Sequence, residues 1–173
     1  MEEMEEPPGS IYEMETLYLT SGETELHSEL KLIELQHEYE MHKKERSVPQ
    51  CAMVLTKIAE CQFELGSLEE AIATSNKSIN LYHYWPNTKW EIKSLLVKVR
   101  SLLSLGRLEE AFHPVILAHN YACILEGADR WTYMRETDIE RLKYSELVND
   151  VEEIEKIKTR TATLNEVLGR GTI

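Results

Sequence analysis

The chain has 173 residues, of which 42% are apolar and 29% are charged, a composition ordinary for one globular domain. Its 19 basic and 31 acidic side chains give a formal net charge of −12, and nucleic acid is therefore not expected as the main partner, because phosphates are bound by clustered Lys and Arg. No apolar run reaches the roughly 18 residues that cross a bilayer, and the acidic N-terminus resembles neither a secretory signal nor a transit peptide, which predicts a cytoplasmic or nuclear protein without membrane contact.

The N-terminal part of the chain predicts a tail and a first pair of helices. The first ten residues are acidic and contain two prolines, which predicts a disordered tail over residues 1–10. Apolar residues then recur at intervals of three and four, which predicts a short helix over Ile11–Leu19 and a longer one over Thr24–Lys44. Gly22 would form a degenerate turn between them, so that residues 11–45 make one helix pair.

One phrase occurs twice in the middle of the chain. ELGSLEEAI, which contains Gly66, and SLGRLEEAF, which contains Gly106, share six of nine positions and lie 40 residues apart. Each follows an apolar run with helical spacing, and its glycine suits the left-handed conformation that ends many helices. The two glutamates suit the first turn of a second helix, where negative charge is favourable. The phrase predicts two helix–turn–helix units, over about residues 51–84 and 91–126.

The last part of the chain also has helical spacing, but it lacks a turn glycine. A helix is expected to start at Gly127 or Asp129. Two interpretations remain, a degenerate fourth helix pair and a long capping helix over residues 129–168, and we prefer the cap because the end of a repeat array needs a polar outer face. The spacing also allows a short coiled coil, but about two to three heptads are too few to favour one. Residues 169–173 are predicted to be a disordered tail.

The two central units resemble the tetratricopeptide repeat. This motif has a large apolar and a small residue in its first helix, glycine at the turn, alanine five residues later and a small residue twelve residues after the glycine. The matching residues are Leu55, Ala59, Gly66, Leu68, Ala71 and Ser78, then Leu95, Val99, Gly106, Leu108, Ala111 and Ala118. Val99 is larger than the motif prefers. The resemblance implies an all-α, right-handed α-solenoid of stacked antiparallel helix pairs, with about six or seven helices in one domain over residues 11–168.

The repeat period of 40 residues exceeds the usual tetratricopeptide period of about 34. The excess falls near Tyr82–Trp90, which reads YHYWPNTKW and predicts a longer second helix followed by a Pro-Asn loop. Units of this length resemble those of kinesin light chains and of the C-terminal domain of SET-and-MYND lysine methyltransferases. Such an enzyme needs a cysteine-rich zinc module and a cofactor-binding domain. This chain has only three scattered cysteines, so it is not expected to methylate a substrate on its own.

No pattern in the sequence indicates catalysis, a metal site or a cofactor. Of the six histidines, His37 and His42 are five residues apart and His113 and His119 are six apart. Metal-binding histidine pairs on one helix face prefer a spacing of three or four. Cys-x-x-Cys, a glycine-rich phosphate loop and Gly-x-Ser-x-Gly do not occur. We therefore expect a non-catalytic protein without metal or cofactor.

In a tetratricopeptide stack, the first helices of the pairs line a concave face that can bind a partner peptide. The resemblance implies that eight residues lie on this face: Met53, Thr56, Glu60, Glu64, Lys93, Leu96, Arg100 and Ser104. The carboxylate clamp of chaperone-binding members is not expected, because its Lys and Asn positions hold Thr56 and Glu60, then Leu96 and Arg100. Lys93 and Arg100 could still hold an acidic peptide.

Two functions remain open from the sequence. The first is a non-catalytic adaptor or scaffold that binds a peptide or helix of a partner protein on the concave face. The alternative is that the chain is the C-terminal domain of a SET-and-MYND-type methyltransferase, which would be inactive alone.

Overall fold

The computed structural model describes the backbone of residues 11–170 and the side chains of residues 26–166. The described chain forms seven helices and, within these residues, no strand. They are α1 (Ile11–Lys44), α2 (Val48–Glu64), α3 (Leu68–Tyr84), α4 (Thr88–Ser104), α5 (Leu108–Ile124), α6 (Gly127–Leu147) and α7 (Val151–Arg170). The all-α class and the number of helices expected from the sequence are confirmed.

The four central helices follow a regular period. Helices α2, α3, α4 and α5 each have 17 residues and are joined by links of three residues, so α2 and α4 begin 40 residues apart, as do α3 and α5. The predicted Pro-Asn loop is the link after α3, residues 85–87. In this link the side chain of Asn87 accepts a hydrogen bond from the backbone amide of Trp90 (3.4 Å) and caps α4.

Four of the turns between helices depend on a residue with left-handed backbone. Gly66 and Gly106 have φ angles of 75° and 69°, as the repeated phrase predicts. Arg46, between α1 and α2, and Asn149, between α6 and α7, have φ angles of 57° and 58°. At all four turns, backbone amides donate to carbonyl groups of the preceding helix end. The same turn is therefore built with glycine in the repeated units and with larger residues at the two ends.

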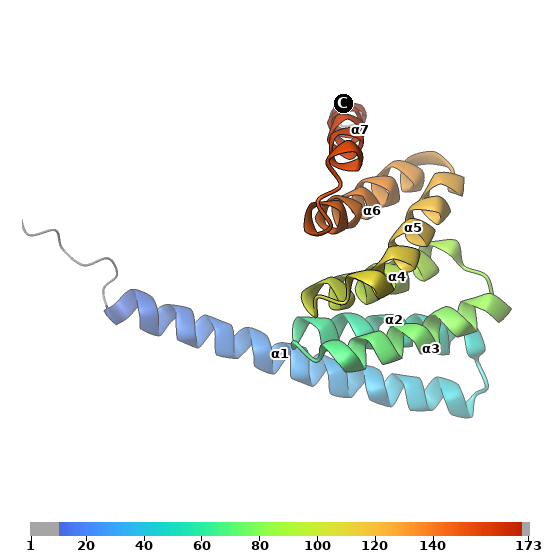
Figure 1. The fold of residues 1–173 in the computed structure, drawn as a ribbon. Coiled ribbons are helices and arrows are strands. Elements are labelled where there is room, and N and C mark those ends of the chain that lie inside the picture. Colours follow the sequence, from blue (N-terminus) through green and yellow to red (C-terminus); the bar gives the residue numbers. More distant parts are fainter. Residues whose placement is uncertain (1–10, 171–173) are drawn as a thin grey trace, which may run out of the picture.

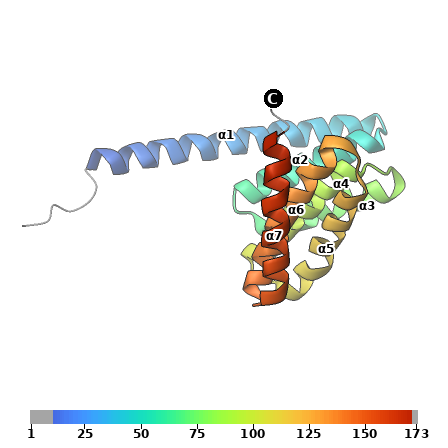
Figure 2. The same cartoon turned by 90° about the horizontal axis from the view of Figure 1, so that it is seen from above.

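Helix α1 differs from the prediction. It is one unbroken helix of 34 residues, so the predicted turn at Gly22 and the helix pair over residues 11–45 are wrong. A glycine inside a helix costs only about 1 kcal/mol, and the helix-forming residues on both sides outweigh this cost. Figures 1 and 2 show that the first part of α1 extends well beyond the other helices. Among the described helices, α1 packs against α2 alone.

The C-terminal part also differs from the prediction. The expected single cap over residues 129–168 is wrong, because the chain turns at residues 148–150 and forms two helices, α6 and α7. Asn149 takes the left-handed conformation that glycine has in the repeated turns, and asparagine adopts it more readily than most residues. Helix α6 starts at Gly127, one of the two predicted positions, and α7 continues to Arg170. The remaining parts of the predicted tails, residues 1–10 and 171–173, lie outside the described chain.

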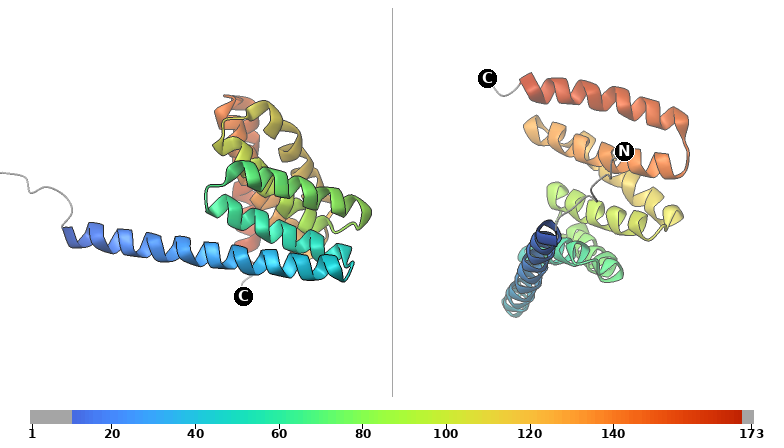
Figure 3. Two further views of the ribbon diagram at one scale, coloured as in Figure 1. Left: turned by 90° about the horizontal axis from the view of Figure 1, so that it is seen from below. Right: turned by 90° about the vertical axis from the view of Figure 1, so that its left-hand side faces the viewer.

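The helices pack in chain order, and alternate helices come together on one side. Each helix contacts the next, while α2 also contacts α4 and α4 contacts α6. The views in Figure 3 show the helices following one another from α1 at one end to α7 at the other. Small residues allow close packing inside the pairs: Ala59 and Ala71 are fully buried against Val97. Helices α2, α4 and α6 thus form a shared surface, which we call the α2–α4–α6 face.

Candidate functional site

The α2–α4–α6 face carries a pocket with a volume of about 460 Å³, which we call the Arg100 pocket. Its lining comes from the C-terminal end of α2, the C-terminal end of α4 and the second half of α6. The lining residues are Phe63, Arg100, Leu103, Ser104, Ile139, Glu140 and Lys143. One wall is therefore apolar and the other is charged, and residues from three different helices must meet to form the site.

A buried carboxylate organises the charged wall of the Arg100 pocket. The side chain of Glu140 is 2% exposed, and its Oε1 accepts a hydrogen bond from Arg100 Nε (2.8 Å). Lys143 Nζ lies 3.2 Å from both carboxylate oxygens of Glu140. The side chains of Arg100 and Lys143 remain 37% and 55% exposed. A buried charge needs paired partners, and here two partly exposed cations share one buried anion, which leaves one positive charge in excess.

Two of the eight predicted residues, Arg100 and Ser104, line this pocket. Two others do not reach solvent: Thr56 and Leu96 are buried, so the expectation that they present side chains to a ligand is wrong. Leu96 belongs to a core cluster with Ile92 and Leu95, because this side of α4 packs against the neighbouring helices. A repeat register gives the spacing along a helix, but it does not show which side the next helix covers.

Thr56 is instead the centre of a buried group of hydroxyls. Its Oγ1 lies 3.0 Å from the hydroxyl oxygen of Tyr82 and 2.7 Å from Oγ of Ser94, and Ser78 donates to the same Ser94 oxygen (2.8 Å). These bonds join α2, α3 and α4. Burial raises the pKa of Tyr82 to about 12, so its hydroxyl stays protonated.

The other four predicted residues lie outside the Arg100 pocket. Met53, Glu60 and Lys93 are partly exposed, and Glu64 is exposed. Burial raises the pKa of Glu60, and the charge of nearby Lys93 opposes this shift. Lys93 Nζ also lies over the ring of Trp90, 4.6 Å from its centroid. Glu60, Glu64 and Lys93 give the α2–α4–α6 face a mixed charge, but the pocket lining includes none of these four residues.

Sequence reasoning missed five lining residues of the Arg100 pocket: Phe63, Leu103, Ile139, Glu140 and Lys143. The residues of α6 were missed because residues 129–168 were interpreted as a cap rather than as a further helix pair. A signal was present, since adding the 40-residue period to Arg100 leads directly to Glu140. Phe63 and Leu103 are also 40 residues apart, but their apolar character favoured a core interpretation.

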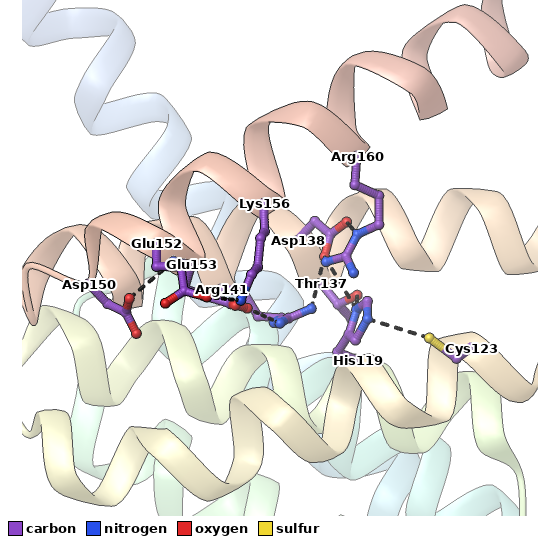
Figure 4. Close-up of polar contacts among 10 residues, drawn as sticks. All are labelled: His119, Cys123, Thr137, Asp138, Arg141, Asp150, Glu152, Glu153, Lys156 and Arg160. Carbon is purple, nitrogen blue, oxygen red and sulfur yellow. Dashed lines mark hydrogen bonds and ion pairs between the residues drawn. The ribbon is translucent and has the colours of Figure 1, made fainter.

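A second polar cluster joins α5 and α6, and Figure 4 shows its members. His119 Nδ1 lies 3.3 Å from Oδ1 of Asp138 and 3.2 Å from Oγ1 of Thr137, while its Nε2 lies 3.4 Å from Sγ of Cys123. This order of thiol, imidazole and carboxylate is that of a nucleophile, a base and an orienting group. However, burial together with two nearby guanidinium groups lowers the pKa of His119 to about 3. The imidazole of His119 is therefore neutral at physiological pH.

The same cluster holds α7 against α6. Asp138 is fully buried, and it forms ion pairs with Arg160 of α7 (Nε to Oδ2, 2.6 Å) and with Arg141 of its own helix. Arg141 is also paired with Glu153 of α7. Next to these contacts, Ile157 is buried between the two helices. The charges of this cluster are thus paired with one another across the α6–α7 contact.

The described residues include no group of three or more His, Cys, Asp or Glu side chains placed to hold a metal ion. None of the helices in the described chain is both long and apolar enough to cross a membrane. Comparison of the chain with known protein families, with curated proteins and with solved structures found no match.

Proposed function

We propose that this chain is a non-catalytic adaptor that binds a peptide or helix of a partner protein on the α2–α4–α6 face. The observation that carries this proposal is the Arg100 pocket, which combines partly exposed cations with apolar side chains from three helices. Its volume of about 460 Å³ lies in the range of ligand-binding pockets, and its lining combines three apolar side chains with four polar or charged ones. The proposal includes a tetratricopeptide-like, right-handed solenoid, for which the 40-residue helix pairs and the glycine turns are the support.

Several features favour binding over catalysis. The contact between the thiol of Cys123, the imidazole of His119 and the carboxylate of Asp138 involves a histidine whose pKa is lowered to about 3. The acidic composition and the three free cysteines fit an adaptor in the cytoplasm or nucleus. The alternative, a domain of a SET-and-MYND-type methyltransferase, stays a prediction from the repeat length.

The proposal can be tested by affinity purification of the tagged full chain from its native cells, with mass spectrometry of the captured proteins. Ser104→Glu places a negative charge at an exposed position of the Arg100 pocket, one helical turn from Arg100. Asn80→Glu adds the same charge at an exposed position of α3 and is the matched control. We expect a set of partners that the wild type and Asn80→Glu retain and that Ser104→Glu loses. Identical partners for all three proteins would contradict the proposal.

A further inference from the structure

The Arg100 pocket also indicates the chemistry of its ligand. We propose that it binds an acidic side chain, Asp or Glu, of a partner peptide together with a bulky apolar side chain next to it on the same peptide. This inference rests on the proposed adaptor function and adds the ligand class to it.

Arg100 has hydrogen-bond donors that no described residue occupies. A guanidinium carries five N–H donors in a planar fork. Only Nε of Arg100 is engaged, with Glu140, and neither terminal nitrogen has a hydrogen-bond partner among the described residues. The two terminal nitrogens of an arginine match the two oxygens of a carboxylate, which gives a bidentate, charge-assisted pair. The free donors therefore suit a carboxylate better than a neutral group.

The cationic groups of the Arg100 pocket are pre-organised. Glu140 is buried and holds both Arg100 and Lys143 from one side, so the two cationic groups are positioned before a ligand arrives. Ordering long side chains during binding costs free energy, and a site that is already ordered avoids this cost. Glu140 thus acts as a positioning residue, and the ligand would meet the cations from the open side of the pocket.

The charged groups that line the Arg100 pocket have a net positive charge. The two cations and Glu140 together carry one positive charge, whereas the chain as a whole carries −12. Outside the pocket lining, Glu60, which lies within electrostatic reach of Arg100, and nearby Glu64 would repel an anion. An acidic side chain is therefore favoured at the Arg100 pocket and disfavoured at its surroundings, which fixes where on the face it binds.

The Arg100 pocket also has an apolar wall. Phe63, Leu103 and Ile139 come from α2, α4 and α6, and Ile139 is 40% exposed. A volume of about 460 Å³ accommodates side chains rather than a folded element. A bulky apolar residue beside the acidic one would cover this wall, while its neighbour pairs with Arg100. Neither interaction alone uses the whole pocket.

The test uses the purified full chain and a displayed library of random octapeptides as the probe. We expect the selected peptides to share an Asp or Glu within a few positions of Leu, Ile, Phe or Met. Binding of the best synthetic peptide is then measured by fluorescence anisotropy. Replacing its acidic residue by the matching amide should weaken binding at least about tenfold, since a hydrogen-bonded charge pair is lost. Added salt should weaken binding of the acidic peptide more than that of the amide peptide.

Two variants at Ser104 test the pocket, because this residue is exposed and lines it. The new carboxylate of Ser104→Glu would lie four residues from Arg100 on the same helix and pair with its terminal nitrogens, so this variant should weaken peptide binding about tenfold. Ser104→Lys should strengthen binding, whereas Asn80→Glu, at an exposed position of α3 outside the pocket, should leave it within about twofold of the wild type. Circular dichroism confirms that each variant is folded.

The outcomes separate the inference from the proposed function. If the selected peptides lack an acidic residue, or bind Ser104→Glu and Ser104→Lys equally, the proposed ligand class is wrong. The proposed adaptor function is not contradicted by that result. If phosphoserine peptides bind far more tightly than the matching Glu peptides, the preferred ligand group is a phosphate and the proposed carboxylate is wrong. If no peptide is selected by the wild type, both the inference and peptide binding by this face are wrong.

Discussion

Arg100 illustrates how one side chain can serve both the fold and a binding pocket. Its Nε neutralises the buried carboxylate of Glu140 while the rest of the group remains partly exposed. Arg100→Glu would place a second carboxylate beside Glu140 and leave only Lys143 to balance both. We expect a loss of about 1–3 kcal/mol in the free energy of unfolding, because a buried charge loses a partner. Chemical denaturation of the purified proteins measures this loss.

Arg107→Glu is the control for this prediction. Arg107 lies in the turn before α5 and, among the described side chains, forms its ion pair with exposed Glu110. Such surface pairs contribute little, so its reversal should change stability by less than about 0.5 kcal/mol. Equal losses for the two variants would show that the Arg100–Glu140 pair does not stabilise the fold.

His119 gives the protein a predictable dependence on acid. In the unfolded chain its pKa is near the usual 6.5, whereas burial lowers it to about 3 in the folded protein. Between these values the unfolded state binds one more proton, so stability falls as the pH drops below about 6.5, by up to about 1.4 kcal/mol per pH unit. Urea denaturation at pH 7, 6, 5 and 4 should show this fall. His119→Gln should be less stable at pH 7 but lose this part of the slope, and an unchanged slope would contradict the assignment.

At the scale of single elements, two substitutions in the turns should change the stability of the protein in opposite directions. Arg46 and Gly66 both have left-handed φ angles, 57° and 75°. A side chain in this conformation costs about 1 kcal/mol, so Arg46→Gly should raise the melting temperature and Gly66→Ala should lower it. A Cβ atom at Gly66 would meet no atom within 4 Å, so the expected loss comes from backbone strain alone. Thermal melts that move in the same direction for both variants would contradict this view of the turns.

The contact between α2 and α3 depends on a small residue. Ala71 is fully buried and packs with Ala59 and Val97, and Glu69 on the same helix is exposed. Ala71→Leu should cost about 1–3 kcal/mol because the added methyl groups overpack the crossing. Glu69→Leu should cost much less. Indistinguishable thermal melts would mean that Ala71 does not lie at a tight crossing.

At the scale of the whole molecule, the fold was predictable where the sequence repeats itself. The phrase around Gly66 and Gly106 predicts α2 to α5 because its glycines, acidic first turns and apolar spacing agree with one another. The ends were not predictable by the same signal. Gly22 lies inside a helix, and Asn149 turns the chain where no glycine stands.

The site was predictable only in part. The repeat register predicted Arg100 and Ser104, which line the pocket, but it also predicted Thr56 and Leu96, which neighbouring helices cover. Covering depends on how the helices pack, and a single helix pattern does not contain this information. Glu140 could have been found, because it lies one period after Arg100.

The most direct test of the proposed function is photo-crosslinking of the intact protein in lysate of its native cells. A benzoylphenylalanine at Ile139 places the reactive group on the apolar wall of the Arg100 pocket. The same replacement at Ile124, an isoleucine exposed at the end of α5, is the control. We predict a discrete partner adduct from position 139 that added acidic peptide from the library selection suppresses, and none from position 124. Adducts of equal yield at both positions, or formed only at position 124, would contradict binding at the α2–α4–α6 face.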